Sequence, residues 1–410
     1  MIRRSLLCVA VSIALSALLA AQNKKVPRPP ALPQGQQPPG ESATPDGYQP
    51  LPQWLGQTRA PMPAKTEAFT VQTVAEGLNG ASFKFLPDGR IRIIGKDGKA
   101  SEPLAGMPTD MFTMGQSLFS VQPDKDFATN RTIYFTYAVL PAGADPVKER
   151  SPAHAHVASA RIAADDKRLE GVKDLLDAEG IGARVIQAND GTLLIETTVP
   201  AGLGILSSDW MQPQQFESLM GKVLRINTDG TIPKDNPFVG KAGARHEIYA
   251  LGFRDPQGIA IHPKTGKLWT SEHGPRGGDE INEVDKGKNY GFPVIGYGRD
   301  YTGKPINGDK TVQAGLEQPV YFWTPDIAPA GIAFYTGKMF PSWNGSLFVS
   351  SMVGRYLIRL VLDGNRVTGE ERLLTDLNVR IRAVNEGPDG SLYVLMDGAN
   401  GKLLRLVKKG

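Results

Sequence analysis

One stretch in the second half of the chain gathers residue types that can bind a metal ion or a charged cofactor. Residues 269–293 read WTSEHGPRGGDEINEVDKGKNYGFP and contain five acidic side chains and five glycines. Backbone carbonyls of a Gly/Pro-rich turn, here at Gly274 and Pro275, can point together at a hard cation, and Asp279 and Glu280 add charged oxygens. The pattern predicts a calcium site. A rigid loop whose carboxylates accept hydrogen bonds from its own amides is the alternative.

A weak internal repeat surrounds this stretch and indicates the elements that must position it. Each copy is a D-G, N-G or T-G turn followed by a short β-rich run, which is typical of a β-hairpin, and one copy is a stretched form. The six copies lie at 85–94, 121–137, 189–195, 262–270, 343–349 and 387–395. Such repetition without long amphipathic helices predicts an all-β, six-bladed β-propeller, with residues 269–293 at its central mouth. A long β-sandwich or two stacked β domains are the alternatives.

The N-terminal part of the chain differs in composition from the rest. Of the 410 residues, 40% are hydrophobic and 21% charged, as expected for a globular protein with a real core. A basic start followed by a short apolar run predicts a signal peptide over 1–21, with an uncleaved anchor as the alternative. Residues 22–65 read as a Pro/Gln-rich disordered linker, and 66–410 as the propeller. These features predict a periplasmic or secreted protein with no membrane span after signal cleavage.

Composition also excludes several classes of function. The single cysteine, Cys8, lies inside the predicted signal peptide, so the mature chain has no thiol, and oxygen or imidazole must hold any metal. A net charge of +4 without a basic block gives no indication of nucleic-acid binding. Motifs of serine hydrolases and nucleotide-binding proteins are absent. The H-x-H pair of His154 and His156 suits a metal, although a solvated pair is the more ordinary interpretation. The oligomeric state stays unknown.

Several runs of the sequence resemble one enzyme family. They are LGFRDPQGIA at 251–260, SEHGPRGGDEIN at 271–282, GKNYGFP at 287–293 and TPDIAPAGIAFY at 324–335, with further matches at 221–238 and 380–394. Together they resemble the soluble PQQ-dependent glucose/sorbosone (aldose sugar) dehydrogenases, and this chain looks like a divergent member. The likeness runs from about Phe69 to the C-terminus. It implies a six-bladed propeller with pyrroloquinoline quinone (PQQ) and Ca²⁺ as cofactors, a sugar substrate and an external electron acceptor.

The resemblance implies roles for individual residues of the 269–293 stretch. The carbonyls of Gly274 and Pro275 match ligands of the calcium that is bound to PQQ. Glu280 and Tyr290 match positions at a second, structural calcium. Arg254 matches the arginine beside the reactive quinone oxygen, where a fixed cation stabilises the negative charge that develops as the quinone accepts hydride.

Other matched positions are implied to contact the cofactor or the sugar. Arg380 and Arg382 match a pair that grips the carboxylates of PQQ, and their R-x-R spacing places both side chains on one face of a strand. Surface arginines on an outer strand are the alternative. The remaining positions are His273 and Asp279 for the cofactor, and Gln116 and Trp323 for the substrate. For Trp323 the alternatives are stacking on a sugar ring and a place in the core.

The matched site departs from the family at the position of the catalytic base. The family has a histidine just before a strand that matches residues 178–187, and Gly180 stands in its place. Its neighbour Glu179 is the candidate proton acceptor, since partial desolvation can raise the pKa of a carboxyl group. A plain surface acid is the alternative. Phe253 and Asp255 also replace the usual residues on either side of Arg254.

These features predict an enzyme that oxidises aldose sugars at C1 to lactones with PQQ and calcium. The main alternative is a propeller that has lost its catalytic base and binds a sugar or cofactor without turnover. A calcium-dependent lactonase of the propeller type ranks third. That class needs a cluster of Glu, Asn and Asp side chains around one metal, whereas the motif here offers backbone oxygens.

Overall fold

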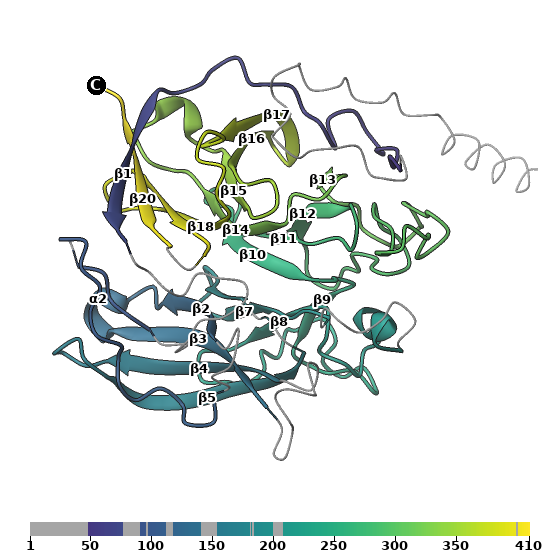
Figure 1. The fold of residues 1–410 in the computed structure, drawn as a ribbon. Coiled ribbons are helices and arrows are strands. Elements are labelled where there is room, and N and C mark those ends of the chain that lie inside the picture. The colour runs from purple at the N-terminus through teal and green to yellow at the C-terminus, as the bar shows by residue number, and fades with distance from the viewer. Residues whose placement is uncertain are drawn as a thin grey trace, which may run out of the picture.

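The computed structural model describes residues 48–410 except 77–90, 96, 112–117, 141–153, 181, 183, 200–207, 399 and 400. Within these residues the chain forms five four-stranded antiparallel sheets, each a simple meander, arranged as the blades of a propeller (Figure 1). The all-β propeller expected from the sequence is therefore confirmed. The expected number of blades, six, is wrong. The predicted signal peptide at 1–21 lies outside the described residues.

The strands follow one another along the chain within each sheet. The first two sheets are β2 (Leu118–Pro123), β3 (Thr132–Val139), β4 (His154–Ile162) and β5 (Leu169–Glu179), then β6 (Arg184–Gln187), β7 (Leu193–Glu196), β8 (Lys222–Ile226) and β9 (Ile248–Leu251). The next two are β10 (Pro256–Ile261), β11 (Leu268–Glu272), β12 (Asp279–Val284) and β13 (Tyr321–Trp323), then β14 (Pro329–Phe334), β15 (Leu347–Ser351), β16 (Leu357–Asp363) and β17 (Arg366–Leu373). The last is β18 (Ile381–Glu386), β19 (Leu392–Met396) and β20 (Leu403–Lys408) with β1 (Phe69–Ala75).

Helical segments are short. In the described part of the chain they are the α-helix α2 (Phe127–Asn130) and the 3₁₀ segments η1 (Ser208–Gln214) and η2 (Pro341–Trp343). Among the described residues, no helix has both the length and the apolar character needed to cross a membrane.

Five of the six repeat copies form the hairpin that joins the first two strands of a sheet. The turns at 189–195 and 387–395 share one local chemistry. The Asp190 carboxylate accepts hydrogen bonds from the backbone N–H (2.9 Å) and hydroxyl (2.7 Å) of Thr192. Asp389 accepts the same pair from Ser391, at 3.1 and 2.6 Å. The glycine between each pair has a positive φ, so the D-G-[ST] pattern fixes a tight turn before the second strand.

The copy at 85–94 accounts for the error in the blade count. Residues 77–90 lie outside the described part of the chain, and the described Ile94 forms an isolated bridge with Ala100 rather than a strand of a sheet. A turn followed by one β-rich run specifies a hairpin, whereas a blade needs four paired strands. Counting hairpin signals therefore overestimated the number of complete blades.

The hydrophobic core lies mainly between neighbouring sheets. One cluster joins the β10–β13 sheet to the β14–β17 sheet, and another joins β14–β17 to β18–β20. In the first, Trp269 of β11 packs edge-on against Phe334 of β14, with ring centroids 5.5 Å apart. In the second, Trp343 stacks on Phe340 at 4.0 Å. Apolar burial between blades thus fixes how each sheet sits against the next.

The two ends of the described chain meet in one sheet. Strand β1 pairs antiparallel with β20, from Phe69 opposite Lys408 to Ala75 opposite Leu403. Figure 1 shows the purple β1 alongside the yellow β20. The sheet that contains the C-terminus is therefore completed by a strand from the beginning of the propeller.

Residues 48–65, the end of the segment expected to be a disordered linker, lie against the propeller. Gln57 is fully buried; its carbonyl accepts from the N–H of Phe322 (2.9 Å), and its side-chain amide donates to the carbonyl of Pro319 (2.9 Å). Farther along, the carbonyl of Pro61 accepts from the N–H of Glu370 on β17 (3.0 Å). The segment thus covers the outer edges of two neighbouring sheets, β13 and β17.

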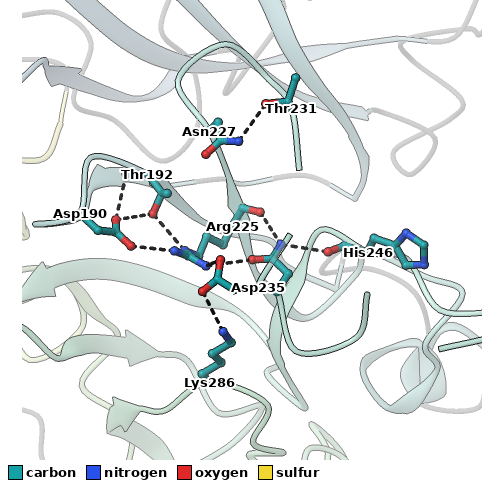
Figure 2. A network of polar contacts seen from close by, with 9 residues as sticks. Asp190, Thr192, Arg225, Asn227, Thr231, Asp235, His246 and Lys286 are labelled. Carbon is teal, nitrogen blue, oxygen red and sulfur yellow. Dashed lines mark hydrogen bonds and ion pairs between the residues drawn. The ribbon is translucent and has the colours of Figure 1, made fainter. Parts of the chain in front are cut away.

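A polar network ties the β6–β9 sheet to the following one. Arg225 of β8 donates to Asp190 of the β6–β7 turn (2.7 Å) and to Asp235 (2.9 Å). Lys286, in the connection after β12, reaches the same Asp235 at 3.0 Å (Figure 2). The network holds the long loop after β8 in place beside both sheets.

Lys222, the first residue of β8, is a buried cation without an acidic partner at hydrogen-bond distance in the described contacts. It is fully buried, and its ammonium donates to the carbonyls of Gln212 (2.8 Å) and Met220 (2.7 Å). Burial lowers the pKa of Lys222 from 10.5 to about 7, although Glu179 and Glu217 partly oppose the shift.

The contacts of Gln57 predict that the 48–65 segment stabilises the propeller. Replacing Gln57 by Ala leaves the buried carbonyl of Pro319 without its donor, so thermal or chemical unfolding should show a loss of about 1 to 3 kcal/mol. Leu55→Ala, on the same segment but exposed, is the matched control. Equal stability of the two variants would contradict a structural role for the segment.

Lys222 predicts a specific dependence of stability on pH. Because the folded-state pKa lies below the unfolded value, the unfolded chain binds more protons between about pH 7 and 10.5, and the contribution of this group to stability rises with pH across that window. The stability of the wild type relative to Lys222→Met should therefore increase over this range, by about 5 kcal/mol at most. Denaturant titrations at several pH values measure it. Lys173→Met, at an exposed lysine that also donates to a carbonyl, is the control. A pH-independent difference for Lys222→Met would refute the interpretation.

Candidate functional site

The turn between β11 and β12 borders a cavity. The space measures ≈ 400 Å³, part of it open to solvent, and residues 290–298 and 306–307 line its other side. Six of the residues predicted from the sequence line it: Arg254, His273, Gly274, Pro275, Glu280 and Tyr290. The structure thus brings the proposed quinone arginine and all four proposed metal-binding positions to one place.

The turn itself can form only with glycine at defined positions. Strand β11 is buried along its whole length and ends at Glu272, where the chain leaves the sheet. A Cβ on Gly274 would lie 2.1 Å from the carbonyl oxygen of Gly277, which no other residue type tolerates. Gly278 has φ +79° and donates its N–H to the carbonyl of Trp323 (2.8 Å). The backbone therefore folds tightly, with Gly274, Pro275 and Gly278 at the cavity wall.

Asp279, the first residue of β12, holds the turn in place. Its carboxylate is almost fully buried and accepts three backbone hydrogen bonds, from Gly274 (2.9 Å), Ile327 (2.7 Å) and Ala328 (2.7 Å). Burial raises the pKa of Asp279, and the nearby Asp326 adds to the shift, whereas the three N–H donors oppose it. The sequence predicted contact with a cofactor, but the structure shows contacts with the protein backbone and does not place Asp279 on the cavity wall.

Arg254, in the connection from β9 to β10, is buried and directs its guanidinium at the same turn. Its Nη1 donates to the carbonyls of His273 and Gly274, both at 2.9 Å. Its backbone N–H donates to Glu272 (2.8 Å), and its Nη2 donates to the hydroxyl of Tyr301 (3.0 Å). The carbonyl oxygens of His273 and Gly274 therefore both accept hydrogen bonds from one buried guanidinium, which fixes this side of the turn against Arg254.

Two buried acids stand opposite each other on the same pair of strands. Glu272 of β11 pairs in register with Glu280 of β12, and the amide of Asn282 donates to both, at 3.0 and 3.4 Å. Burial raises the pKa of Glu272 to about 7, and burial together with Glu272 raises the pKa of Glu280. Both carboxyl groups line the cavity beside Tyr290, whose hydroxyl bonds to the backbone of Glu283 and Asp285.

His273 lies beside Asp255, a residue identified from the sequence only as a departure from the family pattern. Its Nδ1 lies 3.5 Å from the carboxylate of Asp255, and its Nε2 lies 2.8 Å from the carbonyl of Pro329. Gln257 donates to the other oxygen of Asp255 (2.6 Å). Burial by itself would raise the pKa of Asp255, but the His273 ring, the Arg254 charge and the Gln257 hydrogen bond together lower it. Two acceptors at the two ring nitrogens fix the orientation of His273 at the cavity.

The R-x-R pair lies at the start of β18. Arg380 Nε and Arg382 Nη2 approach the same carboxylate oxygen of Asp397, at 2.8 and 3.9 Å. Burial lowers the pKa of Arg382 to about 10, and the nearby Arg184 contributes through like-charge repulsion. Sequence reasoning missed Arg184, which follows the unusual Gly180 region and lies opposite the buried Glu196 in the β6–β7 register. Three guanidinium groups thus lie close enough to influence one another.

The proposed base and its neighbour lie outside the cavity wall. Glu179 accepts hydrogen bonds from the Ser218 hydroxyl (3.1 Å) and the Leu219 N–H (3.3 Å), and lies 3.9 Å from Arg245. Gly180 has φ +96°, and a Cβ there would lie 2.6 Å from the carbonyl oxygen of Thr198. The backbone at the position of the expected histidine therefore requires glycine.

The proposed substrate residues are not at the cavity in the described structure. Trp323 is buried, packs edge-on against Tyr321 and donates its indole N–H to Glu370 (3.2 Å), so it is a core residue rather than an exposed stacking surface. Gln116 lies outside the described residues. His154 and His156 pair with Asp177 (2.6 Å) and Asp174 (2.8 Å) on the outer strands of their sheet. Across the described ranges, no three His, Cys, Asp or Glu side chains are arranged as a metal site.

Comparison with known proteins agrees with this arrangement. The family model described as Glucose / Sorbosone dehydrogenase matches residues 79–405. The aldose sugar dehydrogenase YliI of Escherichia coli is 38% identical over 317 residues, which cover 75% of this chain and 81% of that protein. Quinoprotein glucose dehydrogenase B of Acinetobacter calcoaceticus is 34% identical over 45% of this chain and 50% of its own.

Solved structures give the same result. The crystal structure of the soluble aldose sugar dehydrogenase from Escherichia coli in its apo form matches with a TM-score of 0.75 at 33% identity, over 83% of this chain and 100% of that chain. A crystal structure described as glucose dehydrogenase matches with a TM-score of 0.74 at 37% identity, over 83% of this chain and 100% of that chain. The range matched by the family model, 79–405, includes the turn after β11 and all the residues that line the cavity. The chain belongs to the glucose/sorbosone dehydrogenase family.

Proposed function

We propose that this protein is a PQQ- and calcium-dependent dehydrogenase that oxidises aldose sugars at C1 to lactones and passes the electrons to an external acceptor. The observation that carries the proposal is the Arg254 guanidinium facing the carbonyls of His273 and Gly274 in one cavity. Relatives named as an aldose sugar dehydrogenase and a quinoprotein glucose dehydrogenase support it. The basic and then apolar start at 1–21 supports export to the periplasm or the medium.

The residues present fit a cofactor that carries carboxylates. Arg380 and Arg382 share one acidic partner, Asp397, and the like charge of Arg184 acts on Arg382. Three neighbouring guanidinium groups suit an anionic ligand, which guanidinium groups can bind in a bidentate manner. When bound, PQQ supplies the acceptor for the hydrogen and the two electrons that leave C1 of the sugar. Arg254 would stabilise negative charge at that end of the cavity.

The cavity also fits calcium. Glu272 and Glu280 are two buried acids bridged by the amide of Asn282. A divalent cation would relieve the burial cost that raises the pKa of each, and the repulsion from Glu272 that adds to the shift of Glu280. We assign a structural calcium to Glu280 with backbone oxygen at Tyr290. A second calcium would use the carbonyls of Gly274 and Pro275, which border the same cavity. Calcium accepts such a mixture of carboxylate and carbonyl oxygens.

The proposed oxidation also needs a group that accepts the proton of the sugar's C1 hydroxyl. Glu179 is the proposed acceptor because it adjoins the position of the family's histidine. Its carboxylate accepts hydrogen bonds from the Ser218 hydroxyl and the Leu219 N–H. The second candidate function, a sugar- or cofactor-binding propeller without turnover, is favoured by the glycine-only backbone at Gly180, because a histidine cannot be placed there without moving Thr198.

Sugar-dependent reduction of bound PQQ tests the proposed activity. The purified protein is titrated with PQQ and calcium, and the quinone absorbance should change when an aldose is added. Arg382→Ala should weaken PQQ binding by about tenfold or more, because it removes a buried cation. Arg161→Gln, which breaks an exposed ion pair with Glu170 in another blade, should leave it unchanged.

Each outcome of that experiment is informative. An absorbance change with at least one sugar supports the dehydrogenase. PQQ binding without reduction across a broad panel of aldoses would replace the dehydrogenase by the binding propeller. Absence of PQQ binding would overturn the cofactor assignment itself.

Calcium should stabilise the protein even without PQQ. A ligand at a hundredfold excess over its dissociation constant adds about 2.7 kcal/mol to stability, so a chelator should lower the melting temperature of the wild type. Glu280→Gln should reduce this response. Glu283→Gln, on the same strand but paired with Lys267, should keep it. If neither the chelator nor the Glu280 substitution changes the melting temperature, the loop is held by its own hydrogen bonds.

A further inference from the structure

Tyr301 is an exposed aromatic residue at the proposed active site. Its side chain is 65% exposed, yet its hydroxyl accepts a hydrogen bond from Arg254 Nη2 at 3.0 Å. Arg254 lies between two rings, 5.9 Å from that of Trp210 and 6.0 Å from that of Tyr301. Trp210 is buried and packs against Phe292 (5.3 Å), so Tyr301 is the ring of this pair that solvent can reach.

The loop that carries Tyr301 is held firmly on both sides of it. Arg299 pairs with Asp309 (2.6 Å), and its backbone N–H donates to the carbonyl of Arg276 in the turn after β11 (3.0 Å). The carboxylate of Asp300 accepts from the backbone N–H groups of Thr302 (2.7 Å) and Lys304 (2.8 Å). The exposed ring is therefore presented in a fixed position rather than on a loose loop.

The same loop forms part of the cavity wall. Ile306 and Asn307 line the cavity together with Arg254. An exposed ring beside a cavity, held by a braced loop, has the properties of a ligand-binding surface. Covering a water-exposed aromatic face with a ligand is favourable, because it removes apolar surface from water. The aromatic residue expected for this role, Trp323, is in the core instead.

We propose that Tyr301 positions the sugar substrate by stacking its ring on the apolar C–H face of the pyranose, with Arg254 at the reacting end of the same site. This inference rests on the proposed function. A pyranose suits the surface because one of its faces is largely C–H and its rim is hydroxyl, which matches an aromatic ring next to a hydrogen-bonding guanidinium. Tyr301 is a positioning residue, and its ring, more than its hydroxyl, carries the effect.

Binding of a sugar that cannot react tests the inference directly. The probe is 1,5-anhydroglucitol, a pyranose without a C1 hydroxyl, and its affinity for the full chain is measured by titration NMR with and without PQQ and calcium. Tyr301→Ala should weaken binding by about fivefold or more. Tyr301→Phe, which keeps the ring, should stay within about twofold of the wild type. Lys304→Ala, an exposed side chain on the same loop, is the matched control.

Kinetics separate positioning from a structural effect. In the sugar-oxidation assay, Tyr301→Ala should raise KM for the aldose by about fivefold and leave kcat within about twofold, with the affinity for PQQ unchanged. Wild-type protein that binds no probe, or an Ala variant that binds like the wild type, overturns the inference. So does a Phe variant as weak as Ala, or a loss confined to PQQ affinity. Probe binding that needs Tyr301 in a protein that oxidises no sugar would overturn the proposed function and leave this inference standing.

Discussion

The site depends on one buried carboxylate. Asp279 accepts backbone hydrogen bonds from Gly274 on one segment and from Ile327 and Ala328 on another. Buried N–H groups are costly when unpaired, so a single side chain that satisfies three of them fixes both segments against each other. The direction of the Gly274 carbonyl, and with it the contact to Arg254, follows from that arrangement. The β10–β13 and β14–β17 sheets are joined at the same point.

The sequence could predict those parts of the site that are encoded locally. Arg254, His273, Gly274, Pro275 and Glu280, which were singled out in the sequence, all line one cavity, because most of them lie close together along a single turn. The repeat turns were equally readable, since Asp190 and Asp389 each act on a residue two positions ahead. Roles of residues that depend on packing between distant segments could not be predicted from the sequence.

Two residues show where the limit lies. Trp323 becomes a core residue only because Tyr321 and Glu370, from two different sheets, surround it. Tyr301 becomes part of the site only through its bond to Arg254, nearly fifty positions earlier. The blade count failed for a related reason, since pairing of four strands is a long-range property that no single turn reports. Gly180 is a contrary example. Its departure from the family pattern is visible in the sequence, and the structure shows a backbone there that only glycine can adopt.

The pairing of β1 with β20 has a consequence for how the chain reaches its native state. These strands come from opposite ends of the propeller, so the last sheet is completed by a contact of very high sequence separation, and its loop-closure entropy is lost only when the whole chain is present. During synthesis β1 emerges long before its partner. Its backbone N–H and C=O groups must wait unpaired while the four other sheets form, which makes this edge the point most exposed to wrong pairing between chains.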